Sequence, residues 1–297
     1  MRLISSLWMV LGIAMCASAM ADEQASCRED DLRISAIPLK DMQQLIEEYR
    51  PLANMLSAGL GMPVRILHAS SYESVIDAVV SGGTDIAAMG PASYLIARQL
   101  NPDIEPFASL VPAPGHFSPS GNYYSSLLLV RSDSKLNRVR QLRGRRVALS
   151  DPASTSGGLI PKHEFAAMIG EPLGDYFSRQ VYAGSHDRAL DALLAGRVDA
   201  AFVSSERADD YLQRGLIDKG SLQILWRSDP IYYDPLVFSA AVCESLRQRI
   251  RQLISTPSPE LETFIRSQRA VNIAPVGHEA YQALEPLLQE KAAAAGP

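Results

Sequence analysis

The hydrophobic pattern of the first third of the chain alternates between two periods. Apolar positions recur as expected for strands over residues 32–37, 64–68 and 84–89. Residues 41–60 and 72–80 instead space their apolar side chains three and four positions apart, which predicts helices, and Pro51 either interrupts the first of these or opens a new one. The order strand, helix, strand, helix, strand predicts a parallel sheet covered by helices.

The same alternation returns after residue 122. Strands are expected at residues 124–130, 146–150, 181–183 and 198–203, and helices at residues 156–168 and 187–194. A Pro- and Gly-containing stretch at residues 112–121 separates this unit from the first. From residue 222 onward, a strand-like segment at 223–226 and helical segments at 246–254 and 281–291 predict a return to the first unit. We therefore expect an α/β protein of two lobes, residues 22–118 with 226–297 and residues 119–225.

The first residues have the pattern of a secretory signal peptide. Arg2 precedes an apolar run that ends near Met15, and small residues follow up to Ala21. The apolar run is too short for a membrane anchor. We expect residues 1–21 to be a cleaved leader and the mature chain to be exported and soluble.

The charge and the cysteine content limit which binding partners, disulfides and metal sites are expected. The net charge is −5, and no basic patch interleaved with aromatic residues is found, so nucleic acid is not an expected partner. Removal of the leader leaves Cys27 and Cys243, which could form one disulfide in an oxidising compartment or remain unpaired. No Cys and His residues have metal-ligand spacing, so no metal site is expected.

The segment from Asp151 to Gly158 carries the clearest candidate chemistry. Ser154, Thr155 and Ser156 follow a predicted strand and precede a predicted helix. A helix N-terminus supplies unpaired N–H groups and a partial positive charge, and hydroxyls placed there suit an oxyanion. The alternative is an ordinary N-cap, which Ser and Thr also favour.

Other loops that follow predicted strands carry hydroxyl, phenol or imidazole groups. Ligands of open α/β sheets bind outside the carboxyl ends of strands, so these loops would line one cleft. Each residue also has a purely structural interpretation: a packing ring for Tyr72 and Tyr94, a core histidine for His186, and a helix cap for Asp187 and Ser204. The candidate ligand-binding residues are Tyr72, Tyr94, Ser154, Thr155, Ser156 and His186, with Ser93, Asp187 and Ser204 as secondary candidates.

Five ordered motifs resemble those of the periplasmic phosphonate-, phosphite- and phosphate-binding proteins. They are residues 151–161, Gly90-Pro91-Ala92-Ser93-Tyr94, Ala183-Gly184-Ser185-His186-Asp187, residues 196–201 and residues 229–235. The resemblance covers residues 33 to 270 and implies a type II periplasmic binding fold whose two lobes, each a mixed, mostly parallel sheet flanked by helices, close on a ligand about a hinge. It implies Ser154, Thr155 and Ser156 on the oxyanion, with Tyr72, Tyr94 and His186 completing the pocket.

The resemblance also implies a role, partners and a location. The protein would be the periplasmic solute-binding component of an ABC importer, a monomer without cofactor that delivers a small oxyanion to an inner-membrane permease. The alternative is a sensory subunit of the same fold that signals to a histidine kinase or chemoreceptor. Many proteins of the family that this chain resembles carry an acidic residue where it has Ser204, and in aminoalkylphosphonate binders that acid can meet the ammonium group of the ligand. Its absence here favours phosphite, methylphosphonate or phosphate.

An enzyme is the third possibility. A serine hydrolase could use Ser154 or Ser156 with His186 and an aspartate. The nucleophile elbow G-x-S-x-G requires a glycine two residues before the nucleophile, and the residue two before Ser156 is Ser154. No catalytic residue is therefore expected.

Overall fold

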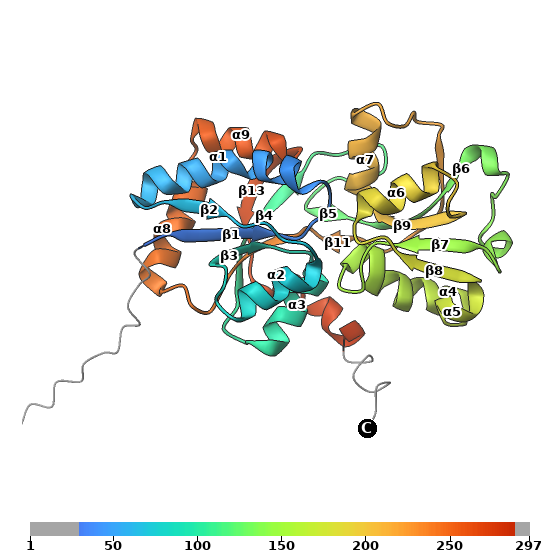
Figure 1. The fold of residues 1–297 in the computed structure, drawn as a ribbon, viewed down its shortest axis with the longest axis horizontal. Coiled ribbons are helices and arrows are strands. Elements are labelled where there is room, and N and C mark those ends of the chain that lie inside the picture. The colour runs from blue at the N-terminus through green and yellow to red at the C-terminus, as the bar shows by residue number, and fades with distance from the viewer. Residues whose placement is uncertain (1–29, 289–297) are drawn as a thin grey trace, which may run out of the picture.

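The computed structural model describes residues 30–288. Two lobes, each built on its own sheet, lie side by side along the long axis of the molecule (Figure 1). The strand order of the first sheet is β13-β4-β12-β3-β1-β2 and that of the second is β10-β6-β9-β7-β8. The first sheet consists of β1 (Leu32–Ala36), β2 (Val64–Ile66), β3 (Ile86–Ala88), β4 (Glu105–Pro112), β12 (Pro235–Phe238) and β13 (Ala270–Pro275). The second consists of β6 (Ser126–Arg131), β7 (Arg146–Leu149), β8 (Arg179–Tyr182), β9 (Ala200–Ser204) and β10 (Leu222–Arg227).

Both sheets are mixed. The pairs β1–β2, β1–β3, β7–β8 and β7–β9 are parallel, and the strands at the other side of each sheet pair antiparallel. The parallel pairs are the ones that the alternation of strands and helices predicts.

The chain passes between the lobes twice. The two crossings run together as the antiparallel ribbon of β5 (Tyr123–Tyr124) and β11 (Ile231–Tyr232). β10 pairs with β6 as far as Arg227, so the boundary expected after residue 225 falls inside a strand of the second sheet. The second crossing therefore begins after Arg227.

Helices cover both faces of each sheet. In the first lobe, α1 (Met42–Leu60), α8 (Glu244–Ser255) and α9 (Pro259–Ser267) share one core with the sheet, and α2 (Tyr72–Val80) and α3 (Pro91–Leu100) share the other. In the second lobe, α6 (His186–Leu194) and α7 (Ser205–Gln213) cover one face, and α4 (Ala166–Ile169) and α5 (Leu173–Tyr176) lie on the other. Because both faces are covered, Leu127 and Leu129 enter one core and Leu128 and Val130 the other, which explains the unbroken apolar run of β6.

Three helical predictions need correction. α1 runs unbroken from Met42 to Leu60 with Pro51 inside it. Asp41 caps its start, and Gly61, at φ 72°, ends it. The helix expected at 156–168 is present, but its first part is π-helical, as η3 (Thr155–Leu159) and η4 (Pro161–Phe165), and it becomes α-helical only at α4. The segment expected to be helical at 281–291 follows the 3₁₀ turn η5 (His278–Ala280) and begins with a second one, η6 (Gln282–Leu284); residues 285–288 are α-helical, and the rest of the segment lies outside the described residues. The remaining 3₁₀ turns are η1 (Ser132–Ser134) and η2 (Val139–Leu142).

The expected leader, residues 1–21, and Cys27 lie outside the described residues. Cys243 precedes α8 and is disulfide-bonded, and its pairing with Cys27 stays a prediction. Within residues 30–288, no helix has the length and apolar character needed to cross a membrane.

Candidate functional site

A small cavity lies between the lobes at the carboxyl ends of β1, β3, β7 and β9. It leaves about 10 Å³ for the centre of a water molecule, which is room for about one water. Residues of both lobes and of the connecting ribbon form its wall. They are Ile37, Leu39, Tyr72, Gly90 and Asp234 from the first lobe, Tyr124 from β5, and Ser154, Thr155, Ser156, His186, Ser204 and Glu206 from the second lobe.

The hydroxyl segment forms one wall of this cavity. Ser154, Thr155 and Ser156 are each 2 % exposed or less. Ser154 is the N-cap of η3, and its Oγ accepts from the N–H of Gly157 at 3.1 Å. Thr155 Oγ1 accepts from the N–H of Ala92 in the opposite lobe at 2.9 Å. The cap interpretation and the cavity-lining interpretation therefore both apply to this segment.

Glycine is required behind the hydroxyls because the π-helical turn packs tightly against its surroundings. A Cβ on Gly157 would lie 2.2 Å from Ser150 Oγ, and one on Gly158 would lie 2.2 Å from the carbonyl oxygen of Asp151. Neither distance is compatible with a side chain. Gly157 also lies against His186, whose Cε1 would be 3.0 Å from the added Cβ.

His186 begins α6 and lies behind Ser154. Its Nδ1 accepts from the backbone N–H of Ser204 at 3.1 Å and lies 2.8 Å from Ser150 Oγ. Its Nε2 lies 3.2 Å from Ser154 Oγ. Burial, with the charge of Arg207 nearby, lowers the pKa of His186 to about 3, so the ring is neutral at physiological pH.

Of the two tyrosine candidates, one lines the cavity and the other does not. Tyr72, the first residue of α2, lines the cavity, and its buried hydroxyl has the Ser154 side chain as its polar neighbour there. Burial raises its pKa well above the usual value, so it is a neutral phenol. Tyr94 does not line the cavity: its hydroxyl lies 2.8 Å from His278 Nδ1, and its ring meets Tyr281 edge-on. The side chain of Tyr94 points into the first lobe, where its polar end reaches the C-terminal turns.

The secondary candidates have different positions. Ser93 bridges the lobes, because its Oγ donates to the carbonyl of Ala153 at 2.9 Å. Ser204 lines the cavity and donates from Oγ to Glu206 Oε1 at 2.6 Å. Asp187 faces away from the cavity and forms a two-point ion pair with Arg207, at 2.9 and 3.0 Å. Asp187 thus has a structural role in holding α6 against α7.

Sequence reasoning missed the acidic residues of the cavity. Position 204 is a serine where aminoalkylphosphonate binders carry an acid, but Glu206, two residues later in the first turn of α7, reaches the cavity. Asp234 approaches from the opposite lobe, immediately before β12. Asp234 lies in the last of the five motifs, residues 229–235, which was the available signal, whereas nothing in the local sequence distinguished Glu206.

Burial raises the pKa of both carboxyl groups. Burial raises the pKa of Glu206 to about 7, although the hydrogen bond that Glu206 accepts from Ser204 acts to lower it. Burial, together with the charge of Glu206, raises the pKa of Asp234 well above its usual value. Glu206 Oε2 has no hydrogen-bond partner among the described residues. The cavity thus combines hydroxyl groups on one side with two carboxyl groups that favour a cation or a proton on the other.

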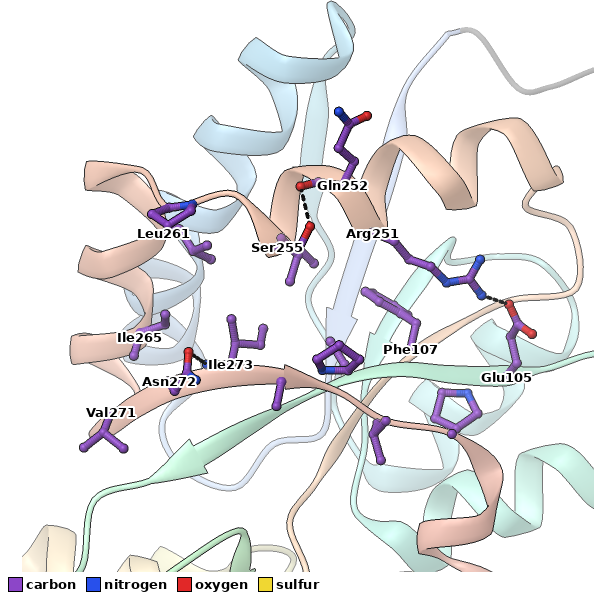
Figure 2. Close-up of a pocket in the computed structure, with 18 of the residues that line it drawn as sticks. Glu105, Phe107, Arg251, Gln252, Ser255, Leu261, Ile265, Val271, Asn272 and Ile273 are labelled. Carbon is purple, nitrogen blue, oxygen red and sulfur yellow. Dashed lines mark hydrogen bonds and ion pairs between the residues drawn. The ribbon is translucent and has the colours of Figure 1, made fainter.

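A larger hollow lies elsewhere, on the outer side of the first lobe. It has a volume of about 1150 Å³ between α8, α9 and the strand β13 at the edge of the sheet (Figure 2). Its wall is mostly apolar, with Phe107, Leu261 and Ile273 among the lining side chains, and Arg251 pairs with Glu105 at one end. The candidate hydroxyl, imidazole and carboxyl side chains line the inter-lobe cavity and not this hollow. Among residues 30–288, no group of three His, Cys, Asp or Glu could hold a metal ion.

Comparison with known proteins agrees with this geometry. Residues 34–283 match the family model of the ABC transporter phosphonate periplasmic substrate-binding protein. The chain is 28% identical to the phosphate-import protein PhnD of Mycolicibacterium smegmatis, over 89% of this chain and 88% of that protein. It is 30% identical to the phosphonates-binding periplasmic protein of Escherichia coli, over 80% of this chain and 68% of that protein.

Solved structures show the same fold. The binding protein of an ABC phosphonate transporter from Pseudomonas aeruginosa superposes with a TM-score of 0.79 at 22% identity, covering 89% of this chain and 87% of the other. PhnD1 of Prochlorococcus marinus, in complex with methylphosphonate, superposes with a TM-score of 0.76 at 17% identity, covering 89% and 98%. These matches confirm the expected two-lobed type II fold, and they do not favour the sensory alternative. The chain belongs to the periplasmic substrate-binding proteins of phosphonate ABC transporters.

Proposed function

We propose that this protein captures a phosphonate between the lobes, at the inter-lobe cavity, which must widen beyond its one-water volume to hold the ligand, and presents the complex to an ABC permease. The observation that carries the proposal is the convergence of buried donors from both lobes on one cavity. Ser154, Thr155 and Ser156 supply hydroxyls from the second lobe, and Tyr72 supplies a buried phenol from the first. A desolvated oxyanion needs such donors, and they complete its coordination only when the lobes are together.

We further propose that the ligand carries an ammonium group on a short carbon chain. The acidic side chains on the cavity wall are Glu206 and Asp234, and no lysine or arginine of residues 30–288 lines it. An ammonium group would pair with both groups in their ionised form and would supply the missing donor to Glu206 Oε2, whereas a plain oxyanion would be repelled by either carboxyl group once it ionised. This revises the preference for phosphite, methylphosphonate or phosphate, which rested on Ser204 alone.

Calorimetric titration with two matched ligands tests both parts. 2-Aminoethylphosphonate carries an amino group that ethylphosphonate lacks. We expect the wild-type protein to bind 2-aminoethylphosphonate at least about 10-fold more tightly than ethylphosphonate. Glu206→Gln should remove most of this preference while retaining ethylphosphonate binding. Equal or tighter binding of ethylphosphonate by wild type would refute the ammonium site and leave the phosphonate proposal intact. No binding of any phosphonate at millimolar concentration would contradict the function itself.

The proposal includes no catalysis. In a serine hydrolase, the histidine accepts the serine proton at Nε2 and donates from Nδ1 to a carboxylate. Here Nδ1 of His186 accepts from the N–H of Ser204, which places the ring proton on Nε2, the nitrogen that faces Ser154. His186 therefore cannot act as the base for Ser154. A release assay with phosphonate esters and phosphomonoesters should show no turnover above buffer.

We also propose a periplasmic monomer that closes about the β5–β11 ribbon. The ribbon joins the lobes by two short strands, and ligand that bridges the lobes would shift the population toward the closed state. Small-angle scattering with and without 2-aminoethylphosphonate tests this, and an unchanged radius of gyration at saturation would count against closure.

A further inference from the structure

A backbone N–H group fixes which atoms donate and which accept in the hydrogen bonds around His186. The N–H of Ser204 can only donate, so His186 Nδ1, 3.1 Å away, must accept. A neutral imidazole with an accepting Nδ1 carries its proton on Nε2. Ser150 Oγ, 2.8 Å from the same Nδ1, is then a second donor to that nitrogen.

The series of hydrogen bonds continues from His186 to Ser154. His186 Nε2–H points to Ser154 Oγ at 3.2 Å, and the N–H of Gly157 donates to the same oxygen at 3.1 Å. A hydroxyl has two acceptor positions and one proton. Both acceptor positions of Ser154 are occupied, so its proton must be directed elsewhere, and Ser154 lines the cavity, where the phenol of Tyr72 lies beside it.

Ser150 is held in place by its surroundings. It follows β7, is completely buried, and pairs through its backbone with Gly157 and Gly184 at 2.9 and 2.8 Å. Gly157 packs so closely that an added Cβ would lie 2.2 Å from Ser150 Oγ. The other acceptor near this hydroxyl is the carbonyl of Phe202, at the limiting distance of 3.5 Å. Ser150 does not itself line the cavity.

We propose that Ser150 is a positioning residue, which together with the N–H of Ser204 holds His186 as the Nε2–H tautomer and thereby makes Ser154 a fixed donor to the ligand. The inference rests on the proposed function of the cavity and adds a specificity to it. The ligand oxygen at Ser154 must be an unprotonated acceptor, because a P–O–H group there would set two protons against each other. Binding energy is gained without reorganisation, because the donor is oriented before the ligand arrives.

The tautomer can be measured directly in the ligand-free protein. Histidine labelled with ¹⁵N gives separate nitrogen signals for the five histidines, and His186→Gln identifies those of His186. At neutral pH, Nε2 is expected to give a pyrrole-type signal and Nδ1 a pyridine-type signal. An Nδ1–H tautomer or a ring protonated on both nitrogens would overturn the inference. This reading does not depend on whether any phosphonate binds, so it separates failure of the inference from failure of the proposed function.

Ser150→Ala tests the positioning role, with Ser126→Ala as the matched control. Ser126 is also buried and its Oγ donates to the same segment, at the carbonyl of Ser156, but it does not touch His186. In Ser150→Ala, the Nδ1 signal should move and the affinity for methylphosphonate and 2-aminoethylphosphonate should fall about 3- to 10-fold, as expected for one lost hydrogen bond. In Ser126→Ala, the Nδ1 signal should stay in place. An unmoved Nδ1 signal with wild-type affinity in folded Ser150→Ala would overturn the role of Ser150.

Discussion

The backbone N–H of Ala92 in the first lobe donates to Thr155 Oγ1 in the second lobe at 2.9 Å. The cavity lies beside this bond, since Thr155 lines it and Gly90, two residues before Ala92, lines it from the other side. A Cβ on Gly90 would lie 3.1 Å from Thr155 Oγ1, so the two lobes are in close contact here. One hydroxyl can therefore serve both lobe closure and ligand binding.

Thr155→Val should weaken phosphonate binding by about 10- to 100-fold. Valine keeps the shape of threonine but leaves the Ala92 N–H and the anion without their partner, a cost of about 1–3 kcal/mol. Calorimetric titration measures the loss. Thr263→Val, on the exposed side of α9 in the first lobe, is the control and should bind as wild type. Unchanged affinity of Thr155→Val would remove Thr155 from the site.

Gly157→Ala should abolish binding and lower the melting temperature. The new Cβ would overlap Ser150 Oγ at 2.2 Å and press on His186 at 3.0 Å, and this buried segment leaves little room to adjust. Thermal unfolding with and without 2-aminoethylphosphonate measures both effects. The control is Gly220→Ala, because no atom lies within 4 Å of its added Cβ. Ligand-induced stabilisation of Gly157→Ala equal to that of wild type would show that the close approach is not needed.

The ligand-free protein should lose stability as the pH rises from about 4.5 toward 7. Burial raises the pKa of Glu206 from 4.5 to about 7, so between these values the folded state keeps the proton that the unfolded state releases. The free-energy cost approaches roughly 3 kcal/mol above pH 7, at 1.36 kcal/mol per pKa unit. The raised pKa of Asp234 acts in the same direction.

Glu206→Gln should remove the part of this dependence that Glu206 causes. Urea unfolding at pH 5 and pH 8 is the measurement. Relative to wild type, the variant should be more stable at pH 8 than at pH 5. A difference between variant and wild type that is the same at both pH values would mean that Glu206 is ionised in the folded protein throughout.

Arg269→Asn should make closure less favourable and reduce its dependence on salt. Arg269 Nε in the first lobe lies 2.6 Å from Asp210 Oδ1 in α7 of the second, and Asp210 is 2 % exposed. Arg207 and Arg214 also pair with Asp210, so the buried carboxylate keeps partners when Arg269 is replaced. Asparagine tolerates the φ of 53° at position 269.

We expect ligand affinity of Arg269→Asn to fall about 3- to 10-fold at low salt and by less at high salt, because the pair is partly screened. Titration at two ionic strengths measures this. Arg266→Asn, which removes an exposed pair with Glu262 within α9, should have no effect on binding. A loss of affinity that is equal in both variants would exclude a specific role for the inter-lobe pair.

The positions of single side chains show where sequence reasoning was limited. Tyr94 belongs to a motif of the family, and its place in α3 directs its ring toward Tyr281 and His278, residues that lie far from it in the sequence. Glu206 was missed for the converse reason, since it lies two positions after the expected site and reaches the cavity from the first turn of a helix. A motif identifies a loop, and the packing of the loop decides which of its side chains face inward.

The sequence by itself determined the alternation of strands and helices, the two lobes and the hydroxyl segment 154–156. These follow from local periodicity and from residues adjacent in the chain, which act whatever the rest of the molecule does. Only the tertiary structure decided that Tyr72, Ser154, His186, Glu206 and Asp234 share one cavity. They lie on separate segments of two lobes, and their convergence depends on how the sheets are ordered and how the lobes meet. The pKa values of Glu206 and Asp234 were likewise set by burial between the lobes, which no local pattern encodes.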